Sequence, residues 1–247
     1  MSDLIDTTEM YLKTVYELEE EGVVPLRARI AERLGHSGPT VSQTVARMER
    51  DGLLVLTGNR QLQLTDEGRE KATRVMRKHR LAERLLVDVV GLDWPHVHEE
   101  ACRWEHVMSE RVERRLLHLL DHPHVDPYGN PIPGLEDLGE LDAAPVREHA
   151  PVRALSDVVA ELLPAGSAST PAGARVENHE VVLQRIGEPL QVDVDLLARM
   201  AEAGLRPGRR LELSIRPGLD LVSLHAPGAE LELDLPEEIT RHLFVTR

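Results

Sequence analysis

The chain of 247 residues is poor in aromatic side chains and in cysteine, and both shortages limit what it can be. Only 2% of its residues are aromatic, so its cores must be built mainly from Leu, Val, Ile and Ala. Cys102 is the only cysteine, which excludes an internal disulfide. An N-terminal apolar signal and long charge-free apolar runs are also lacking, so we expect neither export nor membrane spanning. The sequence predicts a cytoplasmic protein whose thiol stays reduced.

Negative charge dominates the chain, but one segment is basic. The formal net charge is −14 at pH 7. Residues 22–80 nevertheless carry twelve Lys and Arg against six Asp and Glu, whereas residues 81–247 carry sixteen against thirty. Such asymmetry is expected when one domain meets a polyanion and the others do not.

The first 34 residues predict two helices. Apolar side chains at helical spacing indicate an amphipathic helix over 3–20, which Gly22 ends, and a shorter helix over 26–34. A tight turn follows at 35–37. This arrangement is the first half of a helix-turn-helix motif.

A third helix and a hairpin complete a winged helix-turn-helix. The helix is expected to be capped by Ser37 or Gly38, with Pro39 in its first turn, and to end near residue 50. Alternating residues over 53–64 predict the β-hairpin, or wing. In this motif the helix after the turn lies in the DNA major groove.

The third helix has one apolar and one polar face. Val41, Val45 and Met48 are its predicted inward positions. Its predicted outward face offers groups suited to base edges and phosphates: Thr40, Gln43, Thr44, Arg47 and Arg50. Helix pairs with polar outer faces also occur in proteins that bind no nucleic acid, but the wing and the basic segment favour DNA.

Two long helices are predicted after the wing. One begins after Thr65, a natural cap, and runs to about residue 90. The other covers 96–120 and carries an apolar stripe: Val107, Val112, Leu116 and Leu119. We expect these helices to pair in a homodimer, because DNA readers of this type usually bind two-fold sites.

Four potential metal ligands stand close together in the second long helix: His98, Cys102, Glu105 and His106. At about 100° per residue, the first three fall in a narrow sector and His106 lies just beside them. A thiolate beside imidazole and carboxylate suits a divalent transition metal. The alternative is a small buried Cys on a helix whose His and Glu face water.

A second pair of this kind lies on the first long helix. His79 and Glu83 are four residues apart and therefore share one face. They are either further metal ligands or a surface ion pair. Their spacing is compatible with both.

The remainder of the chain predicts a small β domain. The segment 129–134, GNPIPG, stops helical structure, and an acidic stretch up to about residue 151 has the composition of a linker. Residues 164–173 have the composition of a loop. From residue 175 the pattern is mostly period two, interrupted by one helix over 193–203. A small barrel is the expected form.

These motifs closely resemble the diphtheria toxin repressor family, and within it the iron-dependent regulators of actinobacterial type. The resemblance is nearly continuous over residues 3–138 and looser beyond. It rests on five stretches: DTTEMYL at 6–12, PLRARIAERL at 25–34, SGPTVSQTVARMERDG at 37–52, VMRKHRLAERLL at 75–86 and EACRWEHVM at 100–108.

The resemblance implies two metal sites in each subunit. The primary, activating site would be formed by Met10, Cys102, Glu105 and His106. The ancillary site would be formed by His79, Glu83 and His98 and completed by a Glu and a Gln of the C-terminal domain. Glu188 and Gln191 have the E-x-x-Q spacing for the last two ligands, so we assign them to these positions.

The implied metal acts as a corepressor. Held by the primary set, it would tie the first helix to the second long helix and select one disposition of the recognition helices. Without it, Glu105 and any thiolate at Cys102 would be unscreened neighbours that loosen the region. Fe(II) is the expected metal in the cell, and Co(II), Ni(II), Zn(II) or Mn(II) are expected to substitute in vitro.

The resemblance also implies DNA contacts. Homodimers would bind palindromic double-stranded operators, often two dimers to one site. Ser37, Pro39 and Gln43 would lie near base edges. Phosphates would be met by Thr7, Arg27, Ala28, Thr40, Ser42, Arg47, Arg50 and Arg60. So few base contacts imply that DNA shape supplies part of the specificity.

The prediction is therefore an α+β chain: an N-terminal winged helix-turn-helix over 1–74, a helical dimerisation and metal-binding domain over 75–140, a linker over 141–150 and an SH3-like small β-barrel over 151–247. Its predicted function is Fe(II)-activated repression of iron-uptake and related genes, with no catalysis. Two alternatives remain open. One is a metalloenzyme whose site activates water, and the other is a winged-helix regulator that senses an organic ligand.

Overall fold

The computed structural model describes residues 6–140, 152–163, 176–216 and 221–247. The predicted linker at 141–150 and the predicted loop at 164–173 lie outside the described residues. In the part of the chain that is described, no helix is both long and apolar enough to cross a bilayer.

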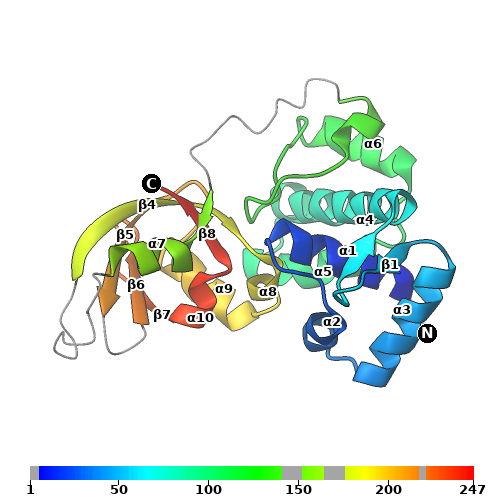
Figure 1. Ribbon diagram of the computed structural model, residues 1–247. Coiled ribbons are helices and arrows are strands. Elements are labelled where there is room, and N and C mark those ends of the chain that lie inside the picture. The colour runs from blue at the N-terminus through cyan, green and yellow to red at the C-terminus, as the bar shows by residue number, and fades with distance from the viewer. Residues whose placement is uncertain (1–5, 141–151, 164–175, 217–220) are drawn as a thin grey trace. The chain divides into compact units, whose positions relative to one another are not determined.

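The chain divides into two compact units (Figure 1). The first unit comprises Met1–Val90, Glu99–Pro123 and Ile132–Asp142. The second unit comprises Gly91–His98, His124–Pro131 and Ala143–Arg247. Each has its own core of buried aliphatic side chains.

The first unit opens with two helices, as predicted. α1 (Thr7–Glu20) begins at Asp6, whose carboxylate accepts hydrogen bonds from the backbone N–H groups of Thr8 and Glu9. α2 (Arg27–Leu34) ends at Gly35, whose φ of +64° is a left-handed conformation that glycine adopts without strain.

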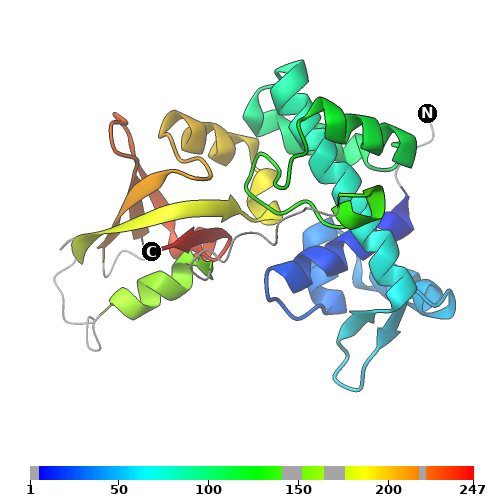
Figure 2. The same ribbon diagram turned by 90° about the horizontal axis from the view of Figure 1, so that it is seen from above.

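The recognition helix and the wing also form as predicted. α3 (Gly38–Arg50) is capped by Ser37, whose hydroxyl accepts a hydrogen bond from the Thr40 N–H at 3.4 Å. β1 (Leu54–Leu56) and β2 (Leu62–Leu64) pair antiparallel, and the hairpin extends away from the helices of the first unit (Figure 2). The winged helix-turn-helix is therefore confirmed.

The inner face of α3 is wider than predicted. Val41, Val45 and Met48 are fully buried, as expected. Thr44, predicted to face outward, is only 9% exposed, so that prediction is wrong. On a helix, Thr44 lies three residues after Val41 and four before Met48, which places it in the same stripe. This stripe packs in a core with side chains of the other winged-helix elements: Tyr11, Leu12, Val15, Leu18, Ile30, Leu53, Leu54, Leu62, Leu64 and Ala72.

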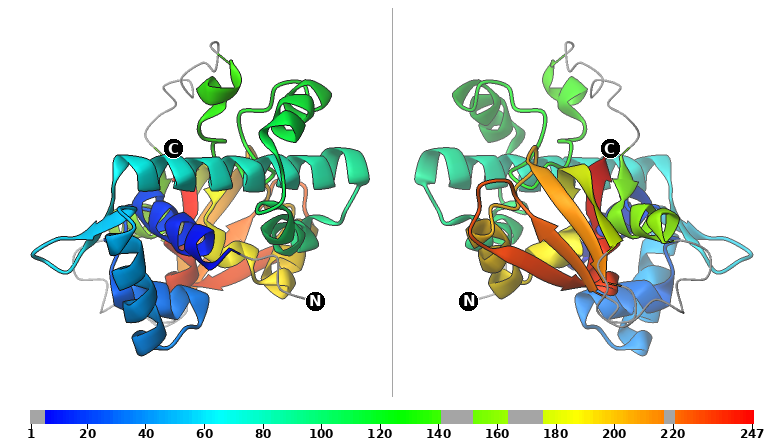
Figure 3. Two further views of the ribbon diagram at one scale, coloured as in Figure 1. Left: turned by 90° about the vertical axis from the view of Figure 1, so that its right-hand side faces the viewer. Right: turned by 90° about the vertical axis from the view of Figure 1, so that its left-hand side faces the viewer.

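The first long helix forms as predicted. α4 (Asp66–Leu85) starts at Thr65, whose hydroxyl accepts a hydrogen bond from the Gly68 N–H at 3.0 Å. The π-helical turn η1 (Leu86–Val90) continues it to the expected end. Within the first unit, α4 lies between α1 and α6 (Figures 1 and 3).

The prediction of one helix over 96–120 is wrong. The chain forms instead the 3-10 turn η2 (Trp94–His96), then α5 (Val97–Trp104), and after a break α6 (Glu110–Leu119). Ser109 has extended backbone angles and its carbonyl accepts from the N–H of Val112 and of Glu113, so α6 starts afresh there. Serine favours such a starting position because its side chain competes with helical hydrogen bonding. A further 3-10 turn, η3 (Leu135–Leu138), follows α6.

The apolar stripe predicted on the second long helix is mostly exposed in the single chain. Leu116 is buried, but Val107, Val112 and Leu119 are 58%, 45% and 60% exposed. Val89 and Val90 in the π-helical turn are also more than half exposed. Exposed aliphatic side chains of this kind are available to pair with a partner.

The second unit is built on a six-stranded antiparallel sheet, which is consistent with the SH3-like domain predicted from sequence. The strands lie in the order β3-β8-β4-β5-β6-β7 (Figure 3). No pairing between β3 and β7 is found among the described residues. The bounds are β3 (Arg153–Ala154), β4 (Val176–Ile186), β5 (Arg210–Arg216), β6 (Leu221–His225), β7 (Glu232–Pro236) and β8 (Leu243–Thr246).

Among the described residues of this unit, four α-helices follow β3 in the chain, and one of them was predicted. α9 (Val194–Glu202) matches the expected helix over 193–203. The others are α7 (Leu155–Leu162), α8 (Glu188–Gln191) and α10 (Glu237–Thr240). The two four-residue helices are too short to produce a helical apolar pattern, which explains why the sequence does not reveal them.

The segment His124–Pro131 is held against β4 within the second unit. The Ile186 N–H donates to the Tyr128 carbonyl at 2.9 Å. A Cβ at Gly129 would come within 1.9 Å of the Gln184 carbonyl oxygen, so only glycine fits there. Beside this segment, the Arg206 guanidinium lies 3.8 Å above the Trp94 ring.

We predict that Gly68→Ala destabilises the protein by about 1–3 kcal/mol. A Cβ at Gly68 would lie 1.8 Å from the Leu53 carbonyl oxygen, so the start of α4 would have to move away from the strand entry. The higher helix propensity of Ala offsets only about 1 kcal/mol of that cost. Urea unfolding followed by circular dichroism measures the difference. Gly58→Ala is the control, because no atom lies within 4 Å of its Cβ position; equal midpoints for the two variants would contradict the prediction.

Candidate metal centre and DNA-binding face

The predicted primary ligands lie where α5 gives way to a turn. Cys102 is in the last turn of α5, and Glu105 and His106 follow directly after the helix. The Glu105 residue is 1% exposed and the His106 side chain 3% exposed. Buried polar groups of this kind require polar partners.

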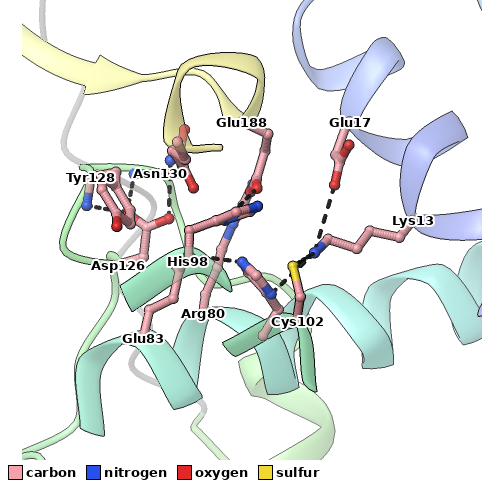
Figure 4. Close-up of polar contacts among 12 residues, drawn as sticks. Lys13, Glu17, Arg80, Glu83, His98, Cys102, Asp126, Tyr128, Asn130 and Glu188 are labelled. Atoms are coloured by element: carbon pink, nitrogen blue, oxygen red, sulfur yellow. Dashed lines mark hydrogen bonds and ion pairs between the residues drawn. The ribbon is translucent and has the colours of Figure 1, made fainter. Parts of the chain in front are cut away.

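Those partners come from α1. Lys13 is 6% exposed, and its Nζ lies 2.9 Å from Glu105 Oε2. The same ammonium donates to Cys102 Sγ at 3.7 Å, a contact drawn in Figure 4. Glu9 Oε2 lies 2.6 Å from His106 Nδ1. Met10 follows Glu9 on α1 and is partly buried. The structure thus brings Cys102, Glu105 and His106 together. It also places them beside Glu9 and Lys13, which lie on either side of Met10 in the sequence of α1.

His79 of α4 bridges two carboxylates in the first unit. Its Nδ1 lies 2.6 Å from Glu105 Oε2, and its Nε2 lies 2.8 Å from Glu83 Oε1. His79 and Glu83 are fully buried, so the alternative of a surface ion pair is wrong. Burial by itself would lower the pKa of His79, but Glu83 raises that pKa well above its ordinary value. The charged imidazolium can donate to both carboxylates at once.

The other titratable groups of the cluster are also tuned by these contacts. Burial by itself would raise the pKa of Glu105, but Lys13 and His79 lower it to about 2. Burial would lower the pKa of His106, but the hydrogen bond with Glu9 outweighs it and raises that pKa. The expectation that Glu105 and Cys102 are unscreened neighbours is therefore wrong, because the Lys13 ammonium lies against both.

The donor set fits a divalent transition metal. An ionised carboxylate, imidazole nitrogens and a thiol surround a buried cationic group within a few ångströms. These side chains already favour positive charge at their centre, and their mixed O, N and S atoms match the preferences of first-row metals of the Fe(II) to Zn(II) range.

The ligands predicted for the ancillary site divide between the units. In the first unit they are His79 and Glu83, described above. In the second unit, His98 Nδ1 lies 3.4 Å from Glu188 Oε2, and both residues are about 5% exposed. Each unit therefore holds one pair of the ligands predicted for the ancillary site: His79 with Glu83, and His98 with Glu188.

Gln191 is oriented for a ligand role. The short helix α8 places Glu188 and Gln191 one turn apart, and Gln191 is 1% exposed. Its Nε2 donates to the Ile186 carbonyl at 2.8 Å, which fixes the amide plane. Its Oε1 is buried and has no hydrogen-bond partner among the described residues. A buried amide oxygen without a partner costs free energy, unless it meets a cation.

The residues predicted to contact DNA lie in the first unit and are mostly accessible. All are exposed except Arg27, which is partly buried. Arg47 Nη2 donates to Thr8 Oγ1 at 3.5 Å, which joins α3 to the start of α1. Arg60 occupies the wing turn in a left-handed conformation, with φ of 61°. The exposed members are Thr7, Ala28, Ser37, Pro39, Thr40, Ser42, Gln43, Arg47, Arg50 and Arg60.

Glu9 and Lys13 are the residues in contact with the candidate metal cluster that sequence reasoning missed. They are four residues apart on α1, and Glu17 continues the same spacing. A charged series at i, i+4 and i+8 is ordinarily a solvated helix face. In the structure Lys13 and Glu17 of this series are buried, and local sequence pattern gives no signal of that burial.

Comparison with known proteins identifies both parts of the first unit. Residues 3–62 match the model of the iron dependent repressor N-terminal DNA binding domain. Residues 65–134 match the model of the iron dependent repressor metal binding and dimerisation domain. Together these matches cover more than half of the chain.

Similarity to individual proteins extends over the full length. The chain is 53% identical to the iron-dependent repressor IdeR of Mycobacterium tuberculosis, over 100% of both chains. It is 52% identical to the diphtheria toxin repressor of Corynebacterium diphtheriae, over 97% of this chain and 98% of that protein.

Solved structures agree on the fold. A manganese-dependent transcriptional repressor in complex with manganese has a TM-score of 0.75 and 27% identity, and covers 97% of this chain and 99% of its own. ScaR with bound Zn²⁺ has a TM-score of 0.72 and 28% identity, over 98% of this chain and 100% of that one.

The metalloenzyme alternative is not supported, because these relatives are transcriptional repressors. The winged helix-turn-helix, the buried donor cluster and the full-length similarity agree. This chain belongs to the iron-dependent repressor family.

Proposed function

We propose that the protein is an Fe(II)-activated transcriptional repressor of iron-uptake and related genes, acting in the cytoplasm. The observation that carries this proposal is the double role of α1. Tyr11, Leu12 and Val15 of α1 pack in the core of the winged helix-turn-helix. On the same helix, Glu9 and Lys13 contact residues of the candidate metal cluster. The cluster is therefore mechanically joined to the DNA-binding face.

The proposed primary site is Met10, Cys102, Glu105 and His106. A bound divalent cation would supply positive charge and directional bonds to these donors. Met10 belongs to α1, whereas the other three belong to α5 and the turn after it. Ligands shared by the two segments would fix α1, and with it α3, in the disposition that fits DNA. Glu9, which contacts His106 Nδ1, would orient the imidazole.

The proposed ancillary site is His79, Glu83, His98, Glu188 and Gln191. The contacts of His79 with Glu83 and of His98 with Glu188 support it, as does the buried amide oxygen of Gln191. Both His79 and Glu83 lie in the same cluster as Glu105. Filling this site would therefore support the primary one.

Fe(II) is the proposed cellular metal. The relative with 53% identity is named an iron-dependent repressor, and the relative with 52% identity is named a diphtheria toxin repressor. Solved structures of more distant relatives hold manganese or zinc. Thioether and thiolate ligands favour Fe(II), Co(II), Ni(II) and Zn(II) over Mn(II). Any of these ions is expected to substitute in vitro, so iron selection would come from availability in the cell.

The proposed DNA partner is a palindromic double-stranded operator bound by homodimers, with two dimers on one site. The exposed Val107, Val112 and Leu119 support self-association. Ser37, Pro39 and Gln43 are proposed to approach base edges. The proposed phosphate contacts are Thr7, Arg27, Ala28, Thr40, Ser42, Arg47, Arg50 and Arg60.

We predict that Fe(II) tightens operator binding by about 5- to 150-fold under anaerobic conditions, the usual range for coupled sites. Met10→Ala and Cys102→Ala should remove most of this gain because each deletes a proposed primary ligand. Fluorescence anisotropy with labelled operator measures it. Leu231→Ala, an exposed position in the second unit, is the control. Equal affinity with metal and with chelator would reject the corepressor role and favour an organic effector.

We predict that the double variant Glu188→Ala with Gln191→Ala loses one of two bound Co(II) ions per subunit. The primary site should survive, so the absorption band from the Cys102 thiolate to Co(II) should remain. Titration calorimetry and absorption spectra measure both quantities. Glu202→Ala, exposed on α9, is the control. Loss of the thiolate band with the other site retained would overturn the assignment.

We predict that Co(II) affinity rises as the pH increases through the raised pKa of His106, by up to about tenfold per pH unit for each displaced proton. The pKa of His106 is raised, so a proton must leave before the imidazole binds metal. Glu9→Gln should move this rise to lower pH because the raising group is lost. Calorimetry in two buffers of different ionisation enthalpy counts the protons. Glu32→Gln is the control, and a flat profile without proton release would refute the prediction.

A further inference from the structure

Lys13 is a buried cation among the proposed primary ligands. The chain has three lysines, Lys13, Lys71 and Lys78. The side chain of Lys71 is 46% exposed, as is usual for lysine, whereas that of Lys13 is 7% exposed. Burying an ammonium costs free energy unless it is paired with acceptors or opposite charges. The contacts of Lys13 therefore indicate its role.

Three of its contacts are with groups that a metal would also use or approach. Nζ lies 2.9 Å from Glu105 Oε2, 3.7 Å from Cys102 Sγ and 3.0 Å from His79 Nδ1. Glu105 and Cys102 belong to the proposed primary set, and His79 to the ancillary set. The ammonium therefore lies against atoms of both sets within the first unit.

A divalent cation on these ligands and an ammonium in contact with them would repel strongly at low local dielectric. The two cations are therefore alternatives. One turn along α1, Glu17 Oε1 lies 3.9 Å from Nζ. Figure 4 draws this contact on the side of Lys13 away from Cys102. The flexible four-carbon stem of lysine can carry the charge toward Glu17 without moving the helix backbone.

We propose that Lys13 is a tethered competitor of the metal: its ammonium neutralises Glu105 and Cys102 when no ion is bound, and it withdraws toward Glu17 when an ion binds. This inference rests on the proposed primary site. The contact keeps α1 joined to the segment after α5 and prevents repulsion between buried anionic groups. It also lowers the apparent metal affinity, because an ion can bind only during the fraction of time in which the ammonium is away from these ligands.

The test measures Co(II) binding to the full-length protein by calorimetry and by the thiolate-to-Co(II) absorption band. Lys13→Met keeps the length and removes the charge. Its Co(II) dissociation constant at the primary site should be lower than that of the unsubstituted protein by about 10- to 150-fold, the range of one charge-assisted hydrogen bond. The melting temperature of chelator-treated Lys13→Met should fall, and Co(II) should restore it.

Three further variants make the result unambiguous. Lys13→Gln repeats the test if Lys13→Met fails to fold. Lys13→Arg retains the charge and should retain the weaker Co(II) affinity. Lys71→Met removes a lysine charge on the exposed face of α4 and should change neither quantity.

The outcomes distinguish failure of the competitor role of Lys13 from failure of the proposed primary site. Equal or weaker Co(II) binding by the two neutral Lys13 variants would overturn the competitor role, while the unsubstituted protein still shows its thiolate band. Absence of that band in the unsubstituted protein, or its persistence in Cys102→Ala, would instead reject the proposed primary site.

Discussion

The neutralisation of one buried carboxylate, Glu105, constrains the whole first unit. A carboxylate that is only 1% exposed must be neutralised by groups in direct contact with it. These groups come from two helices, Lys13 from α1 and His79 from α4. The positions of three helices are therefore linked through a single side chain. Because α1 also packs in the winged-helix core, the charge at Glu105 acts on a helix that shares its core with the recognition helix.

The second unit fixes its polar side chains with backbone carbonyls as well as with opposite charges. The Ile186 carbonyl accepts hydrogen bonds from both the Asn130 and the Gln191 side-chain amides, whereas His98 pairs with Glu188. The hydrogen bond to Ile186 orients Gln191 while leaving its amide oxygen available. A fixed carbonyl holds an amide in place without adding charge, which suits a ligand that must remain neutral.

The sequence was sufficient wherever local rules decide the structure. Ser37, Pro39 and Thr65 marked helix starts correctly, and the wing followed from strand alternation. The motif resemblance named Cys102, Glu105 and His106, which the structure brings together. The break after Trp104 could not be anticipated, because helical periodicity continues through it. Lys13 was missed for a similar reason: its burial depends on α4 and α5, which are distant in sequence, and local patterning carries no record of such contacts.

The shortage of aromatic residues has an optical consequence. The chain has two tryptophans, and each belongs to a different unit. Trp104 immediately precedes Glu105 and donates from Nε1 to Glu100 at 2.9 Å, whereas Trp94 lies under the Arg206 guanidinium. Tryptophan fluorescence of Trp94→Phe would come from the end of α5 beside the candidate metal cluster, and that of Trp104→Phe from the second unit. The protein thus carries one native reporter for each of its parts.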